Sequence, residues 1–291
     1  MRKNQSSLTA QGIAIVRAIE SAKPAEERIC YDPYARQMVS GALFQFVNFF
    51  DRLGYSNRRG PGVMEFLVVR ERYIDDYLEK NLAGGLDQLV ILGAGLDARA
   101  YRFTRLLAGV KVFEVDHPAT QEAKLARLKK VFGCVPETVV FVPVDFNTQT
   151  LEKRLKESGY NPELKTIFIM QGVTQYLTPQ GMDDTLRFIT NNAAPGSTLV
   201  FDYMYTSLLD GSVKHGEVSN MRRNRWLSGE ELSYGIPEGQ ISGFLAQRGF
   251  CEVYNADCQE LQKTYFTGPN AGRKVADGYA IASAVVKPSE K

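Results

Sequence analysis

Residues 89–102, LVILGAGLDARAYR, run from an apolar strand through a glycine turn into a helix. Gly93 and Gly95 allow the tight turn and the close backbone approach that a nucleotide-type ligand needs. Asp116 ends the next apolar run about 20 residues later, where an acid can accept hydrogen bonds from ribose hydroxyls. Dinucleotide dehydrogenases and methyltransferases that use S-adenosylmethionine both build this unit, so the neighbouring residues must decide between them.

Asp97 lies inside the turn and separates the two cofactor types. A dehydrogenase would hold a doubly charged pyrophosphate over the helix N-terminus there, and a carboxylate would repel it. S-adenosylmethionine has no phosphate and carries an ammonium and a sulfonium, so the turn favours the methyl donor. The alternative is that Asp97 only caps the helix, at a position that Asp favours.

Composition limits the class of protein and its partners. The chain has 291 residues, 44% of them hydrophobic, and a formal charge of only +2. A charge this small gives no broad basic surface for nucleic acid and favours a small-molecule partner. Its polar start and the lack of a membrane-length apolar run predict a cytoplasmic protein. The four cysteines are scattered and the only histidines are His117 and His215, so we expect no metal centre.

Helical and strand-like segments follow one another in a simple order. Residues 8–21, 33–50 and 62–82 have apolar residues at helical spacing, and we interpret residues 1–85 as a helical cap on a core of residues 86–291. Strands are predicted at 88–93, 110–115, 138–144, 165–171, 197–203, 250–255 and 278–286, and helices at 98–107, 118–132, 148–158, 179–193 and 240–248. This alternation predicts an α/β fold with a doubly wound, Rossmann-like sheet.

Two segments depart from the alternation. Residues 203–237 are irregular and polar, and we expect them to form an insertion that covers the substrate site. Residues 266–278 read as a loop before the last strand.

Polar residues stand just after the predicted strands, where ligands bind in an open doubly wound sheet. They are Gly93-Ala94-Gly95, Asp116, Asp145-Phe146, Gln171-Gly172 and Asp202. Asp145 could accept from an adenine amino group while the Phe146 backbone donates to the ring; the alternative is that Asp145 caps the next helix and Phe146 is core. Arg70 could pair with a ligand carboxylate, or could lie on a solvated helix face of mixed charge.

Several sequence motifs occur in the same order as in a known family of proteins. They are residues 9–21 (TAQGIAIVRAIES), 31–35 (YDPYA), Arg70, 92–102 (LGAGLDARAYR), 113–118 (FEVDHP), 144–146 (VDF), 176–179 (YLTP) and 201–203 (FDY). Over nearly its whole length the chain resembles the leucine carboxyl methyltransferase-like family of S-adenosylmethionine-dependent methyltransferases, including its bacterial polyketide O-methyltransferase branch. The resemblance implies a class I methyltransferase sheet of seven strands with the last one antiparallel.

The resemblance also implies roles for individual residues. Arg70 would bind the methionine carboxylate, Gly93, Ala94 and Gly95 would line the methionine amino group, and Asp116 would bind the ribose hydroxyls. Asp145 and Phe146 would hold adenine, and Gln171 would face the methionine portion. Asp97, His117 and Gly172 adjoin these residues and complete the predicted cofactor set.

Gln171 departs from the family, whose members usually carry Glu at this position. An amide can still accept a hydrogen bond from the cofactor's ammonium, but a charged hydrogen bond is about twice as strong. The resemblance therefore predicts weakened cofactor binding, and a Gln171→Glu change that tightens it.

Methyl transfer is an in-line displacement, so the enzyme mainly aligns the reactants, and a base is needed only when the acceptor is protonated. A carboxylate needs none, and we assign no catalytic residue. His215 is a candidate base or an exposed loop histidine, and Tyr176 and Tyr203 either line the acceptor pocket or pack in the core. The basic residues around Trp226 could clamp an acidic substrate, contact RNA or form a solvated face.

Three functions stay open from the sequence. The first is a methyltransferase acting on an oxygen of a small-molecule hydroxyl or carboxylate, or on a terminal carboxylate. The second is a non-catalytic adenosyl-ligand binding protein, and the third is an NAD-dependent dehydrogenase. The oligomeric state has no readable signal.

Overall fold

The computed structural model describes residues 8–55, 58, 60–145, 148–212 and 232–288. Within these ranges the chain forms a sheet of seven strands in the order β3-β2-β1-β4-β5-β7-β6. The strands are β1 (Gln88–Leu92), β2 (Lys111–Asp116), β3 (Val139–Pro143), β4 (Thr166–Met170), β5 (Thr198–Met204), β6 (Phe250–Asp257) and β7 (Tyr279–Val286). β7 runs antiparallel to β5 and β6, and the other pairings are parallel. The predicted doubly wound sheet with an antiparallel last strand is confirmed.

The central strands are apolar because helices cover both faces of the sheet. Every residue of β1, β4 and β5 is buried, which matches the continuous Val, Ile, Leu and Phe runs that such strands require. Leu92 at the end of β1 pairs with Val115 of β2 and Met170 of β4. The residues that follow these three strands therefore emerge at one edge of the sheet.

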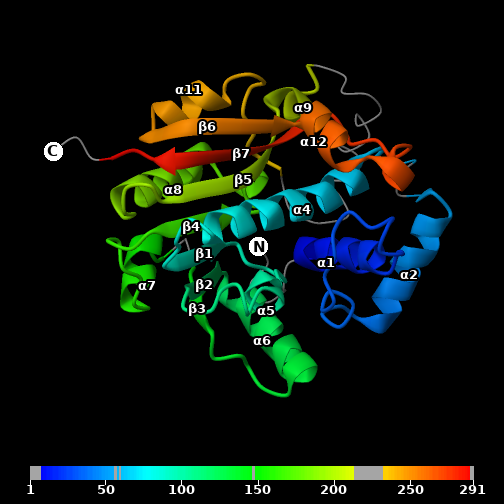
Figure 1. Ribbon diagram of the computed structural model, residues 1–291, viewed down its shortest axis with the longest axis horizontal. Coiled ribbons are helices and arrows are strands. Elements are labelled where there is room, and N and C mark those ends of the chain that lie inside the picture. Colours follow the sequence, from blue (N-terminus) through cyan, green and yellow to red (C-terminus); the bar gives the residue numbers. More distant parts are fainter. Residues whose placement is uncertain (1–7, 56–57, 59, 146–147, 213–231, 289–291) are drawn as a thin grey trace.

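Helices divide between the two faces (Figure 1). One apolar cluster joins the sheet to α4 (Val63–Leu82), α5 (Arg99–Arg102), α6 (Pro118–Phe132) and α12 (Cys258–Tyr265). A second cluster joins the opposite face to α7 (Leu151–Glu157), α8 (Pro179–Asn191) and α11 (Ile241–Ala246). No helix in the described part of the chain is long and apolar enough to span a membrane.

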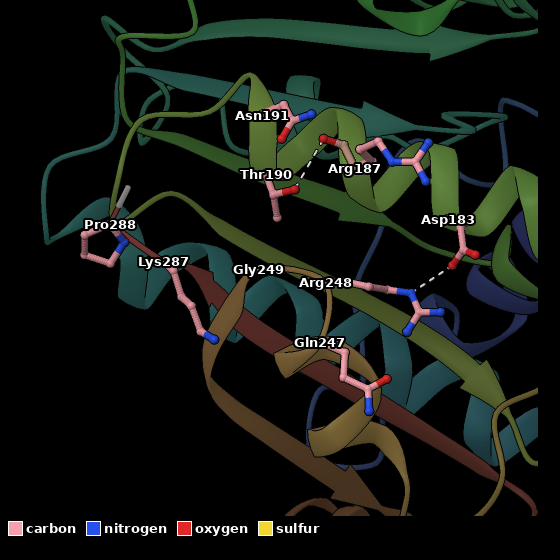
Figure 2. Close-up of a pocket in the computed structure, with 9 residues that line it drawn as sticks. All are labelled: Asp183, Arg187, Thr190, Asn191, Gln247, Arg248, Gly249, Lys287 and Pro288. Carbon is pink, nitrogen blue, oxygen red and sulfur yellow. Dashed lines mark hydrogen bonds and ion pairs between the residues drawn. The ribbon is translucent and has the colours of Figure 1, made fainter. Parts of the chain in front are cut away.

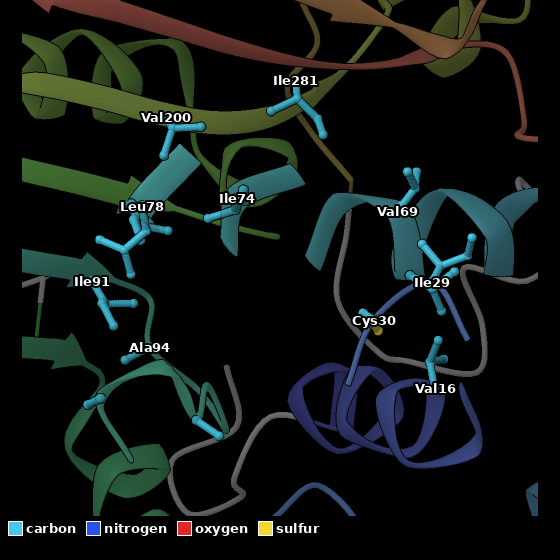
Figure 3. Packing of buried hydrophobic residues seen from close by; sticks show 14 of the residues in the cluster. Val16, Ile29, Cys30, Val69, Ile74, Leu78, Ile91, Ala94, Val200 and Ile281 are labelled. Atoms are coloured by element: carbon cyan, nitrogen blue, oxygen red, sulfur yellow. The ribbon is translucent and has the colours of Figure 1, made fainter. Parts of the chain in front are cut away.

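The long helix α4 packs directly on the sheet. Figure 3 shows Ile74 and Leu78 of α4 in one cluster with Ile91 of β1 and Val200 of β5. The other end of α4 contributes Val69 to the same cluster, which extends there to residues of α1. The boundary at residue 85 stays a prediction, and this packing ties α4 to the sheet's core.

The N-terminal helices differ in part from the prediction. Helix α1 (Leu8–Ser21) has its predicted bounds, but α2 (Gly41–Arg52) begins eight residues after the predicted start at Pro33. The carboxylate of Asp32 accepts hydrogen bonds from the backbone N–H groups of Tyr34 and Ala35. These bonds stabilise a turn where the pattern predicted a helix.

Further corrections concern short elements. The helix predicted at 98–107 is only α5, and the Thr104 hydroxyl bonds back to the carbonyl of Tyr101 where the helix has ended. Helix α12 was not predicted, although Asp257 caps it by accepting from the N–H of Glu260, a pattern readable from sequence. In the described ranges, the short helices not yet named are η1 (Thr174–Tyr176), α9 (Thr206–Asp210) and η3 (Gly268–Asn270).

The predicted insertion begins later than expected. β5 continues through Tyr203 to Met204, so the departure from the sheet starts at Tyr205. A bridge between Tyr205 and Ile236 brings the two described ends of the segment together. Residues 213–231 lie outside the described residues.

Candidate functional site

The glycine turn after β1 is packed closely on both sides. Gly93 and Gly95 have φ values of +66° and +44°, in the left-handed region that glycine tolerates. A Cβ on Gly93 would lie 2.3 Å from Cγ2 of Val173, and one on Gly95 would lie 3.2 Å from Cβ of Ala10. The turn is therefore held between α1 and the loop that follows β4.

Asp116 binds the same turn from the end of β2. Its Oδ2 accepts from the N–H of Gly95 at 2.5 Å, and its Oδ1 accepts from the N–H of His117 at 2.6 Å. Burial raises the pKa of Asp116, and these two backbone hydrogen bonds only partly oppose the rise. The structure thus brings together Asp116 and the glycine turn, as predicted.

His117 and Asp145 follow β2 and β3. His117 is the N-cap of α6, and its Nδ1 accepts from the N–H of Ala119 at 3.3 Å, so the imidazole supports the helix. Asp145 is half-buried in a turn, where its carbonyl accepts from the N–H of Thr148. The N-cap of α7 is Thr150, so the alternative role of Asp145 as that cap is wrong. Phe146 lies outside the described residues.

Arg70 joins α4 to the strand ends. Its side chain is 2% exposed, and Nη1 lies 2.6 Å from Oδ2 of Asp202 at the end of β5. The second oxygen of Asp202 accepts from the N–H of Gly172 at 2.6 Å. The alternative of a solvated face is wrong for Arg70, and it holds for Arg72, whose side chain is half exposed. Nε of Arg70 is buried with no hydrogen-bond partner among the described residues.

Gln171 contacts the carboxylate of Glu71, the residue that follows Arg70 on α4. Its Nε2 donates to Oε1 of Glu71 at 2.8 Å. Glu71 is 2% exposed and also accepts from Arg17 of α1 at 3.1 Å and from Arg99 of α5 at 2.6 Å. Within the described ranges, Oε1 of Gln171 is buried and has no hydrogen-bond partner.

The carboxylate of Asp97 is held by Arg99, the same residue that contacts Glu71. One of its oxygens accepts from the backbone N–H of Arg99 at 2.7 Å, and the other pairs with the Arg99 guanidinium. The N-cap residue of α5 is Ala98, so Asp97 does not occupy that position. Its role beside the cofactor stays a prediction.

Two sets of buried ion pairs lie near the strand ends, the Arg70–Asp202 pair and a network around Arg99, and we call them together the acidic cluster. Among the described residues it comprises four guanidiniums, Arg17, Arg70, Arg99 and Arg102, and five carboxylates, Asp32, Glu71, Asp75, Asp97 and Asp202. The carboxylates therefore outnumber the guanidiniums by one. Sequence reasoning missed most of these residues, although the four-residue spacing of Glu71 and Asp75 places both on one face of α4.

The predicted acceptor-pocket residues separate. Tyr203 is 1% exposed in the apolar cluster beneath α8 and α11, and its hydroxyl lies 3.0 Å from Oδ1 of Asn255. Because Asp202 and Tyr203 alternate across β5, Tyr203 faces away from Arg70 and packs in the core, as the alternative interpretation predicts, and its place in an acceptor pocket stays a prediction. Tyr176 is half-buried in η1 and stays a prediction. His215 and the basic residues around Trp226 lie outside the described residues.

A hollow of about 830 Å³ lies beside the start of β6 and the end of β7. Figure 2 shows its lining, which consists of Asp183, Arg187, Thr190, Asn191, Gln247, Arg248, Gly249, Lys287 and Pro288. The hollow adjoins the C-terminal ends of α8 and α11. Basic side chains at a helix C-terminus can donate hydrogen bonds to its last carbonyl groups, and Lys287 Nζ donates to the Ala246 carbonyl at 3.3 Å. No group of three or more metal-ligating side chains occurs in the part of the chain that is described.

The sheet order, its antiparallel last strand and the glycine turn define a class I S-adenosylmethionine-dependent methyltransferase fold. The sequence model described as "Leucine carboxyl methyltransferase" matches residues 10–190. The chain belongs to this family. It is an S-adenosyl-L-methionine-dependent methyltransferase, and S-adenosyl-L-methionine is its cofactor.

Relatives carry names that agree with this assignment, and a solved structure shares the fold. A Bacillus subtilis (strain 168) protein named "Putative S-adenosyl-L-methionine-dependent methyltransferase" is 28% identical over 92% of this chain and 93% of its own. A Mycolicibacterium vanbaalenii protein of the same name is 32% identical over 88% and 86%. A Streptomyces avermitilis structure of the DUF574 family has a TM-score of 0.57 at 14% identity, covering 97% of this chain and 98% of its own, which is a likeness of fold.

Proposed function

We propose that this methyltransferase transfers the methyl group to an oxygen atom, either a hydroxyl or a carboxylate of a small molecule, or a terminal carboxylate. When bound, S-adenosyl-L-methionine supplies a methyl group made electrophilic by its sulfonium. Arg70, Gln171 and the Gly93–Gly95 turn hold the amino-acid end of the cofactor. Asp116 holds the ribose and Asp145 the adenine.

The single observation that carries the placement of the cofactor is a pair of buried polar atoms, one a hydrogen-bond donor and the other an acceptor. Nε of Arg70 is a donor and Oε1 of Gln171 is an acceptor, and neither has a hydrogen-bond partner within the described ranges. An unsatisfied buried polar group is unfavourable, so a ligand that pairs with both atoms is favoured here. An α-carboxylate satisfies the donor and an α-ammonium satisfies the acceptor, and both belong to the methionine end of the cofactor.

The charge of the acidic cluster supports a cationic ligand. Its surplus carboxylate is buried, where a negative charge is stabilised by a nearby positive one. A sulfonium compound brings that positive charge, whereas a dinucleotide pyrophosphate would add two negative ones. Asp116 adds a further acid at the end of β2, beside Gly95.

The choice of oxygen as the acceptor atom follows from the family and from the histidine that the structure describes. The family is named for methylation of a carboxyl group, which is an oxygen nucleophile. A carboxylate is ionised at neutral pH, so the protein needs only to align it. The imidazole of His117 is engaged at the start of α6 and is not required as a base in this proposal.

Incubation of the protein with radiolabelled S-adenosyl-L-methionine and a panel of carboxylic, phenolic and alcoholic acceptors tests the proposal. We expect label in an ester or ether product. Alkaline hydrolysis then separates the two, because it releases volatile methanol only from a methyl ester. Label appearing on nitrogen or carbon contradicts the choice of oxygen, and saturable cofactor binding without any product favours a non-catalytic binding protein.

A further inference from the structure

The amide of Gln171 has a fixed orientation. Its nitrogen end faces the carboxylate of Glu71, with Nε2 2.8 Å from Oε1. A carboxylate only accepts hydrogen bonds, so the amide nitrogen must face it and the amide oxygen must face away. That oxygen is the buried acceptor described above, which has no partner in the described part of the chain.

Glu71 is itself held as an ionised acceptor. Arg17 of α1 and Arg99 of α5 contact different oxygens of its carboxylate, at 3.1 Å and 2.6 Å. Burial alone would raise the pKa of Glu71, but the guanidiniums of Arg99 and Arg17 outweigh burial and hold this pKa well below its usual range. Three elements, α1, α4 and α5, thus converge on one carboxylate that contacts the end of β4.

We propose that Glu71 is a positioning residue, which turns the oxygen of the Gln171 amide toward the ammonium of the cofactor. This inference rests on the proposed placement of the methionine end at Arg70 and Gln171. Glu71 and Gln171 then act as one unit, in which the buried acid is on α4 and the neutral group directly follows β4. The family's Glu at position 171 would place the acid directly beside the cofactor.

The pairing reverses the expectation for Gln171→Glu. The new carboxylate would lie against Glu71 at the present 2.8 Å contact, and two buried carboxylates at that distance repel each other. We expect this repulsion to displace the new carboxylate from its place beside the ammonium. The variant then loses one charged hydrogen bond and should bind S-adenosyl-L-homocysteine about tenfold or more weakly. Exchanging the two groups in the double variant Glu71→Gln/Gln171→Glu keeps one acid and one amide, and we expect it to recover most of the affinity.

Calorimetric titration with two ligands tests the proposal. S-adenosyl-L-homocysteine carries the amino-acid end, and 5′-methylthioadenosine lacks it. Gln171→Glu leaves the ion pairs of Glu71 in place, so it should fold and should lose affinity only for the first ligand. Gln180→Glu is the matched control, because the Gln180 amide also donates to a carboxylate at 2.8 Å, that of Asp184, but on the exposed surface.

The outcomes separate this inference from the proposed function. Equal or tighter binding of S-adenosyl-L-homocysteine by Gln171→Glu, or an equal loss of both ligands, overturns the role of Glu71. Failure of the wild-type protein to bind either ligand overturns the proposed site itself, and this inference with it. If the variants that carry Glu71→Gln do not fold, Gln171→Glu still decides, because it keeps Glu71 and its ion pairs.

Discussion

Nη1 of Arg70 lies 2.6 Å from Oδ2 of Asp202, and this buried pair joins α4 to the end of β5. The two side chains are 2% and 4% exposed. Because Asp202 also accepts from the N–H of Gly172, the pair fixes the loop after β4 as well. Removal of the guanidinium would leave the buried carboxylate of Asp202 without its ion pair. Of these two contacts, only the hydrogen bond from the N–H of Gly172 would remain.

We expect Arg70→Ala to lower the free energy of unfolding by about 3–5 kcal/mol, the usual cost of breaking a buried ion pair from one side. Urea denaturation followed by circular dichroism measures the change. Arg72→Ala is the control on the same helix, because the Arg72–Asp76 pair is exposed and should contribute no more than about 1 kcal/mol. Equal costs for both variants would contradict a stabilising role for the buried pair.

The glycine turn gives a second prediction. Gly93→Ala places a methyl group 2.3 Å from Cγ2 of Val173 at a φ of +66°. We expect a loss of about 1–3 kcal/mol in unfolding free energy from overpacking, with weaker binding of S-adenosyl-L-homocysteine because the turn must shift. Thermal unfolding and calorimetric titration measure the two effects.

Gly243→Ala is the matched control for this change. Gly243 lies in α11, and a Cβ there would meet nothing within 4 Å. Ala is favoured over Gly in a helix, so this variant should be as stable as the wild type or up to about 1 kcal/mol more stable. Retention of full stability and ligand affinity by Gly93→Ala would show that the turn is not tightly constrained.

The sheet could be predicted from sequence because its central strands are short runs of mostly apolar residues, such as residues 166–170. The candidate site could be predicted in outline for a related reason: parallel strands end at one edge, so Asp116 and Gln171 had to lie near the glycine turn. The helix at α5 was predicted too long. Hydrophobic periodicity does not report local side-chain hydrogen bonds such as the one that forms where α5 ends.

The acidic cluster could not be predicted. A helix with Arg70, Glu71, Asp75 and Asp76 has the same composition whether its charged face meets water or guanidiniums from other elements. In the structure Glu71 and Asp75 meet Arg99, and Asp76 meets the exposed Arg72. Only the docking of α1 and α5 against α4 decides this, and that docking depends on contacts distant in sequence.

Another buried acid, Glu20, ties α1 to the segment before β7. Both oxygens of Glu20 accept from Arg273, at 2.8 Å and 3.1 Å, and Oε1 also accepts from the N–H of Ile29 at 2.8 Å. Burial alone would raise the pKa of Glu20, but the hydrogen bonds from Arg273, Ile29 and Lys23 outweigh burial and lower this pKa below its ordinary 4.5.

The direction of this shift fixes its pH dependence. Because the pKa of Glu20 is lower in the folded state than in the unfolded state, its stabilising contribution is present above pH 4.5 and is lost as the pH falls through the lower, folded-state value. Glu20→Gln should therefore lower the unfolding free energy at neutral pH by about 1–3 kcal/mol, with a difference from wild type that narrows in acid. Urea titrations at neutral and acid pH measure this difference, with the exposed Glu79→Gln as control. A difference that stays constant across the acid range would mean that the ionisation of Glu20 does not stabilise the fold.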